Sequence, residues 1–378
     1  MNRVRRRLWI AALVAAVIAP MILVYSCETG VKQNLAFERE YNINPRIGID
    51  SNSVCGCRLT RPEFAKSYVV QRKNPKADWN VDCASCVEDY RRFIKKARKY
   101  SRKQTRETTM DLVDKAVDGW THLKPIVRDP LKLSEIVRKA LGTGFLYENL
   151  DKRPQLVEVA EVIREFSYTE SHLIFRDPWV GSFPAILRVP NDLTEPAPAV
   201  ILIHGHGESA EGVYYNHRFQ ELTDQRIITI APTMRANFAD GNETEIALEL
   251  LDNGFSLLGL RIYETLLVRK YLRALQCVDP EHIALVGHSG GSVNNNVLMR
   301  IDSDFAAYVF DATGLYNGLY QKRCTDETVP ALYPYHRSIS DPKTFSLPYH
   351  QAPYDFEGDY EVIFRFLNEH LRKTESKK

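Results

Sequence analysis

The residues with the clearest chemical potential form the run Gly287-His288-Ser289-Gly290-Gly291. The run fits the pattern G-x-S-x-G, which places a serine on a sharp turn between a strand and a helix. Side chains two residues before and after that serine would collide with neighbouring backbone, so glycine is required at both positions. The following helix would aim its N-terminal amides at negative charge that forms beside the serine. The spacing therefore predicts that Ser289 is a nucleophile; the alternative is a glycine-rich turn with an idle serine.

The segments on either side of this turn predict the elements that it needs. Residues 283–286 are apolar and predict a short strand buried on both faces, and residues 293–299 predict a helix directly after the turn. Further apolar runs predict buried strands at residues 199–203, 226–232 and 305–311 and a long helix at residues 255–275. This alternation indicates an α/β fold with a largely parallel sheet. Shorter β-rich runs between residues 156 and 189 predict antiparallel strands that open a mixed sheet.

Several of these segments form a recognisable series along the chain. They are PAVILIHGHG at 198–207, IAP at 230–232, NGFSLLG at 253–259, VDPEHI at 278–283 and GHSGG at 287–291. In this order they resemble the α/β-hydrolase superfamily, nearest to its dienelactone hydrolase and acetyl xylan esterase-like branches. The resemblance covers roughly residues 155 to 372. It implies the α/β-hydrolase fold, with a mostly parallel central sheet flanked by helices, and a serine-dependent esterase activity.

The resemblance also implies roles for backbone groups near Ser289. In the superfamily, the oxyanion is held by the N–H after the nucleophile, here Gly290, and by one just after the earlier His-Gly, here His206 or the next residue. Each such donor typically lowers the barrier by about 3 kcal/mol. We expect the side chains of His204 and His206 to hold their loop, and His288 to be a neighbour of the site and not its base.

A serine is a poor nucleophile at its ordinary pKa, so a histidine base and an orienting acid must converge on it. In the superfamily both follow the nucleophile along the chain. The histidines after Ser289 are His336, His350 and His370, and the last lies in a predicted closing helix as a surface residue. We predict that His350 is the base, because it follows a plausible last strand at residues 344–349 and precedes the closing helix.

Asp311 is the predicted acid, because it ends the strand after the serine turn. Residues 312–343 are long enough for a parallel crossover, so the strands before Asp311 and His350 can be neighbours. Asp341 is too close to His350 for a crossover, although a loop could bring it in. In a second alignment, Asp355 is the acid and the chain ends before the strand that carries the base. The protein would then be a catalytically inactive binding scaffold.

The start of the chain has the features of an export signal. Four arginines among the first seven residues precede an apolar run at residues 8–25. This pattern predicts a membrane anchor or signal at residues 1–27, with the rest of the chain on the periplasmic or outer side. The alternative is a lipoprotein signal with lipidation at Cys27.

Residues 28–154 are predicted to form a mostly helical, cysteine-containing extension, beginning with an irregular linker that reaches about residue 80. Cys55, Cys57, Cys83 and Cys86 could bind zinc, but in an oxidising compartment disulfides are favoured. Residues 87–103 predict an amphipathic, basic helix whose charged side faces solvent.

Composition limits the remaining classes of function. The 378 residues are 44% hydrophobic, enough for a core of about 250 residues and a smaller unit. The net charge of +2 indicates no nucleic-acid partner. We therefore expect an exported, membrane-anchored serine esterase at residues 155–372, followed by a polar tail at 373–378. It would act on small or polymer-linked esters and require no metal or organic cofactor.

Overall fold

The computed structural model describes part of the chain, all of it within the compact unit Ile49–Lys378. The described residues are 68–72, 83–100, 103–105, 107–109, 111–112, 130–148, 150–151, 155–205, 208–235, 243–313, 343–348 and 356–372. The predicted anchor at residues 1–27, Cys55, Cys57 and the tail at 373–378 lie outside them. Among the residues that are described, no helix combines the length and the hydropathy needed to cross a membrane.

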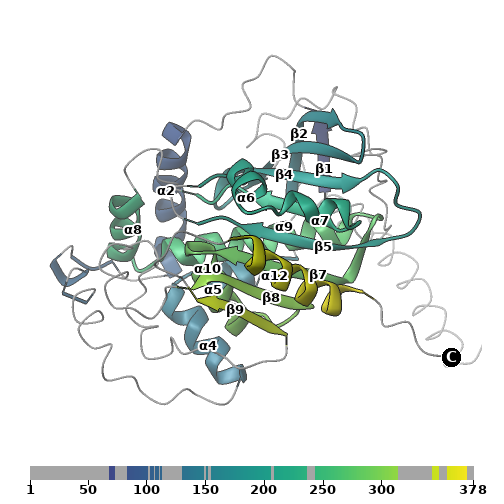
Figure 1. The fold of residues 1–378 in the computed structure, drawn as a ribbon. Coiled ribbons are helices and arrows are strands. Elements are labelled where there is room, and N and C mark those ends of the chain that lie inside the picture. Colours follow the sequence, from purple (N-terminus) through teal and green to yellow (C-terminus); the bar gives the residue numbers. More distant parts are fainter. Residues whose placement is uncertain are drawn as a thin grey trace, which may run out of the picture. The chain divides into compact units, whose positions relative to one another are not determined.

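The described strands form one nine-stranded sheet with the order β1-β2-β3-β4-β6-β5-β7-β8-β9 (Figure 1). They are β1 (Tyr68–Arg72), β2 (Gln155–Arg164), β3 (Tyr168–Asp177), β4 (Gly181–Pro190), β5 (Ala197–Ile203), β6 (Ile228–Pro232), β7 (Val278–His288), β8 (Ala307–Thr313) and β9 (Thr344–Pro348). Strands β2, β3, β4 and β6 pair antiparallel, whereas β6, β5, β7, β8 and β9 are all parallel to one another. The predicted mixed sheet is confirmed, and its largely parallel part fits the predicted α/β-hydrolase fold.

Helices cover both faces of the sheet. They are α2 (Cys83–Ala97), α4 (Pro130–Leu141), α5 (Gly144–Tyr147), α6 (Ala210–Asn216), α7 (Gln220–Asp224), α8 (Glu243–Asp252), α9 (Leu257–Ala274), α10 (Gly290–Ile301) and α12 (Phe356–Leu371), with a short 3₁₀ turn at Arg98–Tyr100. Side chains alternate between the faces along each strand. Ile201 and Leu285 therefore pack with α9 and α10 in one cluster, and Val200 and Val286 pack with α6 and α12 in the other.

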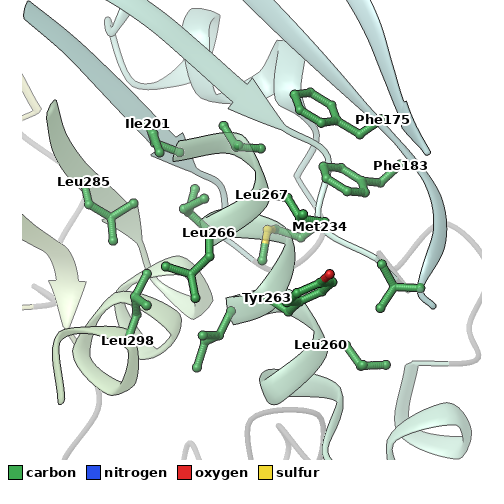
Figure 2. Packing of buried hydrophobic residues seen from close by; sticks show 14 of the residues in the cluster. Phe175, Phe183, Ile201, Met234, Leu260, Tyr263, Leu266, Leu267, Leu285 and Leu298 are labelled. Atoms are coloured by element: carbon green, nitrogen blue, oxygen red, sulfur yellow. The ribbon is translucent and has the colours of Figure 1, made fainter. Parts of the chain in front are cut away.

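Helix α9 is the centre of the larger cluster. Its N-terminus is capped by Ser256, whose hydroxyl accepts from the backbone N–H of Gly259 at 3.0 Å. Every residue of α9 except Arg273 is buried. Figure 2 shows Leu266 and Leu267 of this helix in one cluster with residues of the sheet. The predicted long helix that packs against the sheet is therefore confirmed.

The buried charges of α9 are paired. Glu264 forms an ion pair with Arg235, and Arg269 binds Asp302 at 2.6 Å. Lys270 donates to the backbone oxygen of Leu150 at 2.8 Å. These partners offset part of the cost of removing the charges from water, since burial still raises the pKa of Glu264 and lowers that of Lys270.

Two elements from the predicted extension join the same unit as the sheet. We expected an irregular linker up to residue 80, but β1 lies within it and pairs parallel to β2, with Val70 opposite Val157. That part of the expectation was wrong. The predicted basic helix is present as α2, where Arg91, Arg92, Lys95 and Lys96 are exposed. Its opposite side is buried in the core, and the rings of Phe93 and Phe255 lie 5.0 Å apart.

Candidate active site

Ser289 lies on the turn between β7 and α10, as the sequence predicted. Its backbone has φ of 48° and ψ of −110°, a conformation that residues with a Cβ atom seldom adopt. Such a conformation costs about 1–3 kcal/mol and persists only where the surroundings impose it. Here the backbone N–H of Ser289 donates to the carbonyl oxygen of Asp311 at 2.9 Å, which ties the turn to β8.

The glycines of the turn are required by close backbone contacts. A Cβ atom at Gly287 would lie 2.4 Å from the carbonyl carbon of Gly291, and one at Gly291 would lie 2.2 Å from the carbonyl oxygen of Ile203. Both distances are too short for any side chain. The reason predicted for glycine at these two positions is therefore confirmed.

The loop after β5 approaches the serine from the other side. A Cβ atom at Gly205 would lie 3.0 Å from the Cβ of Ser289 and 3.0 Å from the Cδ2 of His288. Gly290 begins α10, so its N–H belongs to the helix end that lacks intrahelical acceptors. His206, the other predicted oxyanion donor, lies outside the described residues, and its role stays a prediction.

His288 and Asp311 form a hydrogen-bonded pair directly beside the nucleophile. The two residues face each other in the register of β7 and β8, and the Nδ1 of His288 lies 2.8 Å from the Oδ2 of Asp311. Both residues are buried. A carboxylate oxygen accepts, so the Nδ1–H of His288 donates to Asp311. The sequence predicted His288 as a neighbour of the site, but its pairing with Asp311 was not foreseen.

A second histidine, His217, packs against the first. Its ring centre lies 3.9 Å from that of His288. Its Nε2 lies 2.5 Å from the Oε1 of Glu208, and its Nδ1 hydrogen-bonds with the hydroxyl of Tyr360 at 2.6 Å. The other oxygen of Glu208 accepts from the backbone N–H of Gly205 at 2.8 Å. None of these three side chains was predicted, and no spacing in the sequence relates them to the serine.

Glu208 is ionised at neutral pH. Burial raises the pKa of its carboxyl, but the hydrogen bond and charge of His217, the charge of His288 and the Gly205 N–H outweigh burial. The net effect lowers the pKa of Glu208 to about 2. A negative charge is therefore held within the loop that borders Ser289.

The predicted base and the alternative acids lie outside the described residues. They are His336, His350, Asp341 and Asp355. The prediction that the strands before Asp311 and His350 are neighbours is confirmed, because β8 and β9 pair in parallel. Their carboxyl ends therefore meet at the same edge of the sheet as Ser289.

Two other histidines have structural partners. The Nδ1 of His204 lies 2.8 Å from the carbonyl oxygen of Gly205, and its Nε2 accepts from the backbone N–H of Met234 at 2.8 Å. His204 therefore holds the loop after β5, as predicted. His370 hydrogen-bonds through Nδ1 with the carbonyl oxygen of Phe366 at 2.9 Å, within its own helix.

No protein-family model matches the chain, and no curated protein sequence matches it. Several solved structures are similar to it. The acetyl xylan esterase from Paenibacillus sp. R4 is 12% identical, with 67% of this chain and 99% of that chain covered and a TM-score of 0.48. A glucuronoyl esterase from Solibacter usitatus is 13% identical, with 43% and 52% covered and a TM-score of 0.36.

A third similar structure is a candidate acetyl xylan esterase from Bacteroides fragilis, 16% identical, with a TM-score of 0.41. That similarity covers 50% of this chain, and the chain spans 55% of the length of that protein.

Proposed function

We propose that the protein is a serine-dependent carboxylic ester hydrolase in which Ser289 attacks the ester carbonyl. The observation that carries the proposal is the strained backbone of Ser289, with φ of 48°, between a central parallel strand and a helix N-terminus. Strain of this kind is retained at functional sites, and the helix amides beside the serine favour the negative charge of a tetrahedral intermediate. Gly290 and His206 are the proposed oxyanion donors.

The proposed base is His350, with Asp311 as the acid that orients it. The support is topological: β9 ends two residues before His350, and it is the parallel neighbour of β8, which contains Asp311. In this mechanism His350 takes the proton of the Ser289 hydroxyl during attack and gives it to the leaving alcohol. Water then hydrolyses the acyl-enzyme by the same proton transfers in reverse.

A fluorophosphonate probe tests the nucleophile, because it reacts covalently with activated serines. We expect the folded wild type to be labelled and the Ser289→Ala variant to lose both labelling and hydrolysis of p-nitrophenyl acetate. Ser167→Ala is the matched control, since Ser167 is exposed on the loop after β2. Folded wild-type protein that neither reacts with the probe nor hydrolyses any ester would exclude the proposal.

The second candidate is a catalytically inactive α/β-hydrolase-fold scaffold. The observation that favours it is that the carboxylate of Asp311, the proposed acid, is bonded to His288. An acid that serves His288 alone would leave the proposed base without orientation. The same probe experiment distinguishes the two candidate functions, because the probe should label no serine of an inactive scaffold.

The substrate is proposed to be a small or polymer-linked ester. Acetylated oligosaccharides and methyl esters of sugar acids are the first compounds to test, and release of acetate or methanol is the measurement. Activity confined to long-chain triglycerides would contradict this part of the proposal.

We also propose that the protein is exported and held at a membrane by residues 1–27. The support is the run of arginines followed by apolar residues 8–25. Expression of the full chain and of residues 28–378, followed by cell fractionation, tests this. The Cys27→Ser variant distinguishes the lipid anchor from the helical one, because only the lipid anchor requires the thiol.

A further inference from the structure

A cluster of potential metal ligands lies beside Ser289 and takes no part in the proposed ester hydrolysis. Glu208, His217 and His288 each offer one ligand atom, and these three atoms lie within 4.8 Å of one another. The two histidines are buried and Glu208 is half-buried. Two imidazole nitrogens and one carboxylate oxygen form a ligand set that binds Zn²⁺ in enzymes, with a fourth position left for water or substrate.

The second nitrogen of each histidine ring is already held. The Nδ1 of His288 lies 2.8 Å from the carboxylate of Asp311, and the Nδ1 of His217 lies 2.6 Å from the hydroxyl of Tyr360. Histidines that bind a metal almost always have such a partner, because it fixes the ring orientation and the tautomer. Both rings therefore have Nε2 as the nitrogen for a metal.

Glu208 is oriented in the same manner. One of its oxygens accepts from the backbone N–H of Gly205 at 2.8 Å, and the other faces the Nε2 of His217 at 2.5 Å. A cation between these two groups would replace the proton that they share. The His217 ring can then carry its proton on Nδ1, because the Tyr360 hydroxyl is able to accept as well as donate.

We propose that Glu208, His217 and His288 bind a divalent transition-metal cation of the zinc class. Zinc bonds to nitrogen and oxygen are about 2.0–2.2 Å long, so modest rotations of the three side chains complete the site. The cation would lie next to the nucleophile, because Gly205 approaches Ser289, His288 and Glu208 alike. It would offset the negative charge of Glu208 beside Ser289.

Titration of the full-length protein, without a histidine tag and after treatment with a chelator, tests the site. Isothermal calorimetry with Zn²⁺ gives affinity and stoichiometry, and visible absorption of bound Co²⁺ reports four-coordinate geometry. Glu208→Gln and His217→Ala are each expected to remove one equivalent of bound metal. Asp311→Asn is expected to weaken binding about 10- to 100-fold through the orientation of His288.

The control is His282→Ala, because His282 also pairs with a carboxylate, that of Asp279 at 3.0 Å, but belongs to no three-ligand group among the described residues. It should bind metal as the wild type does. Cysteines elsewhere in the chain can bind zinc as well. The test therefore compares the equivalents of metal bound by each variant with those bound by the wild type.

Equal binding by the wild type, His217→Ala and Glu208→Gln would overturn the proposal, and so would no binding by the wild type. Circular dichroism shows whether each variant is folded, and Glu208→Gln preserves the shape of the side chain if His217→Ala does not fold. The metal result is independent of probe labelling at Ser289, so either proposal can fail alone.

Discussion

The nucleophile turn depends on two glycines that have no room for a methyl group. Gly291→Ala would place a Cβ atom 2.2 Å from the carbonyl oxygen of Ile203, so either β5 or α10 must shift. We expect the free energy of unfolding to fall by about 1–3 kcal/mol, and probe labelling at Ser289 to be lost. Urea denaturation measures the first effect. Gly144→Ala is the control, because a Cβ atom there would lie no closer than 3.3 Å to any atom, the nearest being the Cβ of Arg138. An equal loss in this variant would contradict the steric argument.

Two of the three candidate acids, Asp311 and Asp355, can be distinguished by removing one charge at a time. If Asp311 orients the base, Asp311→Asn should lower kcat by up to about 10⁴-fold, as loss of the orienting carboxylate does in serine proteases. Asp355→Asn should then change kcat little. Steady-state hydrolysis of p-nitrophenyl acetate measures both variants. A large loss in Asp355→Asn with near-normal Asp311→Asn would assign the acid to Asp355 and leave Asp311 as the partner of His288.

The sequence was sufficient to predict the serine turn but not the side-chain pairs beside it. Gly287 and Gly291 lie at a fixed spacing from Ser289. The local sequence alone therefore predicts that both positions need glycine for steric reasons. The pairing of His288 with Asp311 depends on the register between β7 and β8, which sequence does not determine for two strands apolar on both faces. His217 reaches His288 only because α6 ends beside the serine turn, a long-range contact with no local signal.

At the scale of elements, α2 is part of the core that supports the sheet. The side chain of Phe93 is fully buried and its ring packs against those of Phe145 and Phe255. We expect Phe93→Ala to reduce the free energy of unfolding by about 3–5 kcal/mol, while unfolding keeps a single transition. Lys95→Ala, on the exposed side of the same helix, should change it by less than about 0.5 kcal/mol. A separate transition for α2 in urea would show that this helix folds independently of the sheet.

Most of the elements from residue 155 onward could be predicted, because each is a long apolar or alternating run and turn residues lie between the runs. The strand β1 could not. Its five residues, Tyr68–Arg72, lie among prolines and charged residues and have too short a pattern to suggest a strand. The conformation of so short a segment depends on the strand with which it pairs, here β2. Likewise, the apolar side of α2 was visible in the sequence, but nothing showed that it would pack against Phe255.

For the molecule as a whole, Glu208 should contribute to acid stability. Its pKa is lowered from 4.5 to about 2 in the folded protein, so its ionised form stabilises the fold above pH 4.5. That contribution is lost progressively as the pH falls from about 4.5 to about 2. Glu208→Gln lacks it at every pH. The wild type should therefore exceed the variant in Tm at pH 6, and the difference should shrink toward pH 2. Thermal unfolding with a chelator present measures this, and a difference that is constant with pH would refute it.

The complete burial of α9 also bears on how the chain reaches its folded state during synthesis. The helix packs against β5 and β6, which are made before it, and against β7 and α10, which are made after it. Until residue 301 has left the ribosome, β7 and α10 cannot pack against α9, so much of the leucine-rich surface of α9 stays exposed to solvent. Exposed apolar surfaces promote aggregation of unfinished chains. If the protein is exported, a chaperone that keeps this stretch unfolded until translocation is complete would be of direct use to the cell.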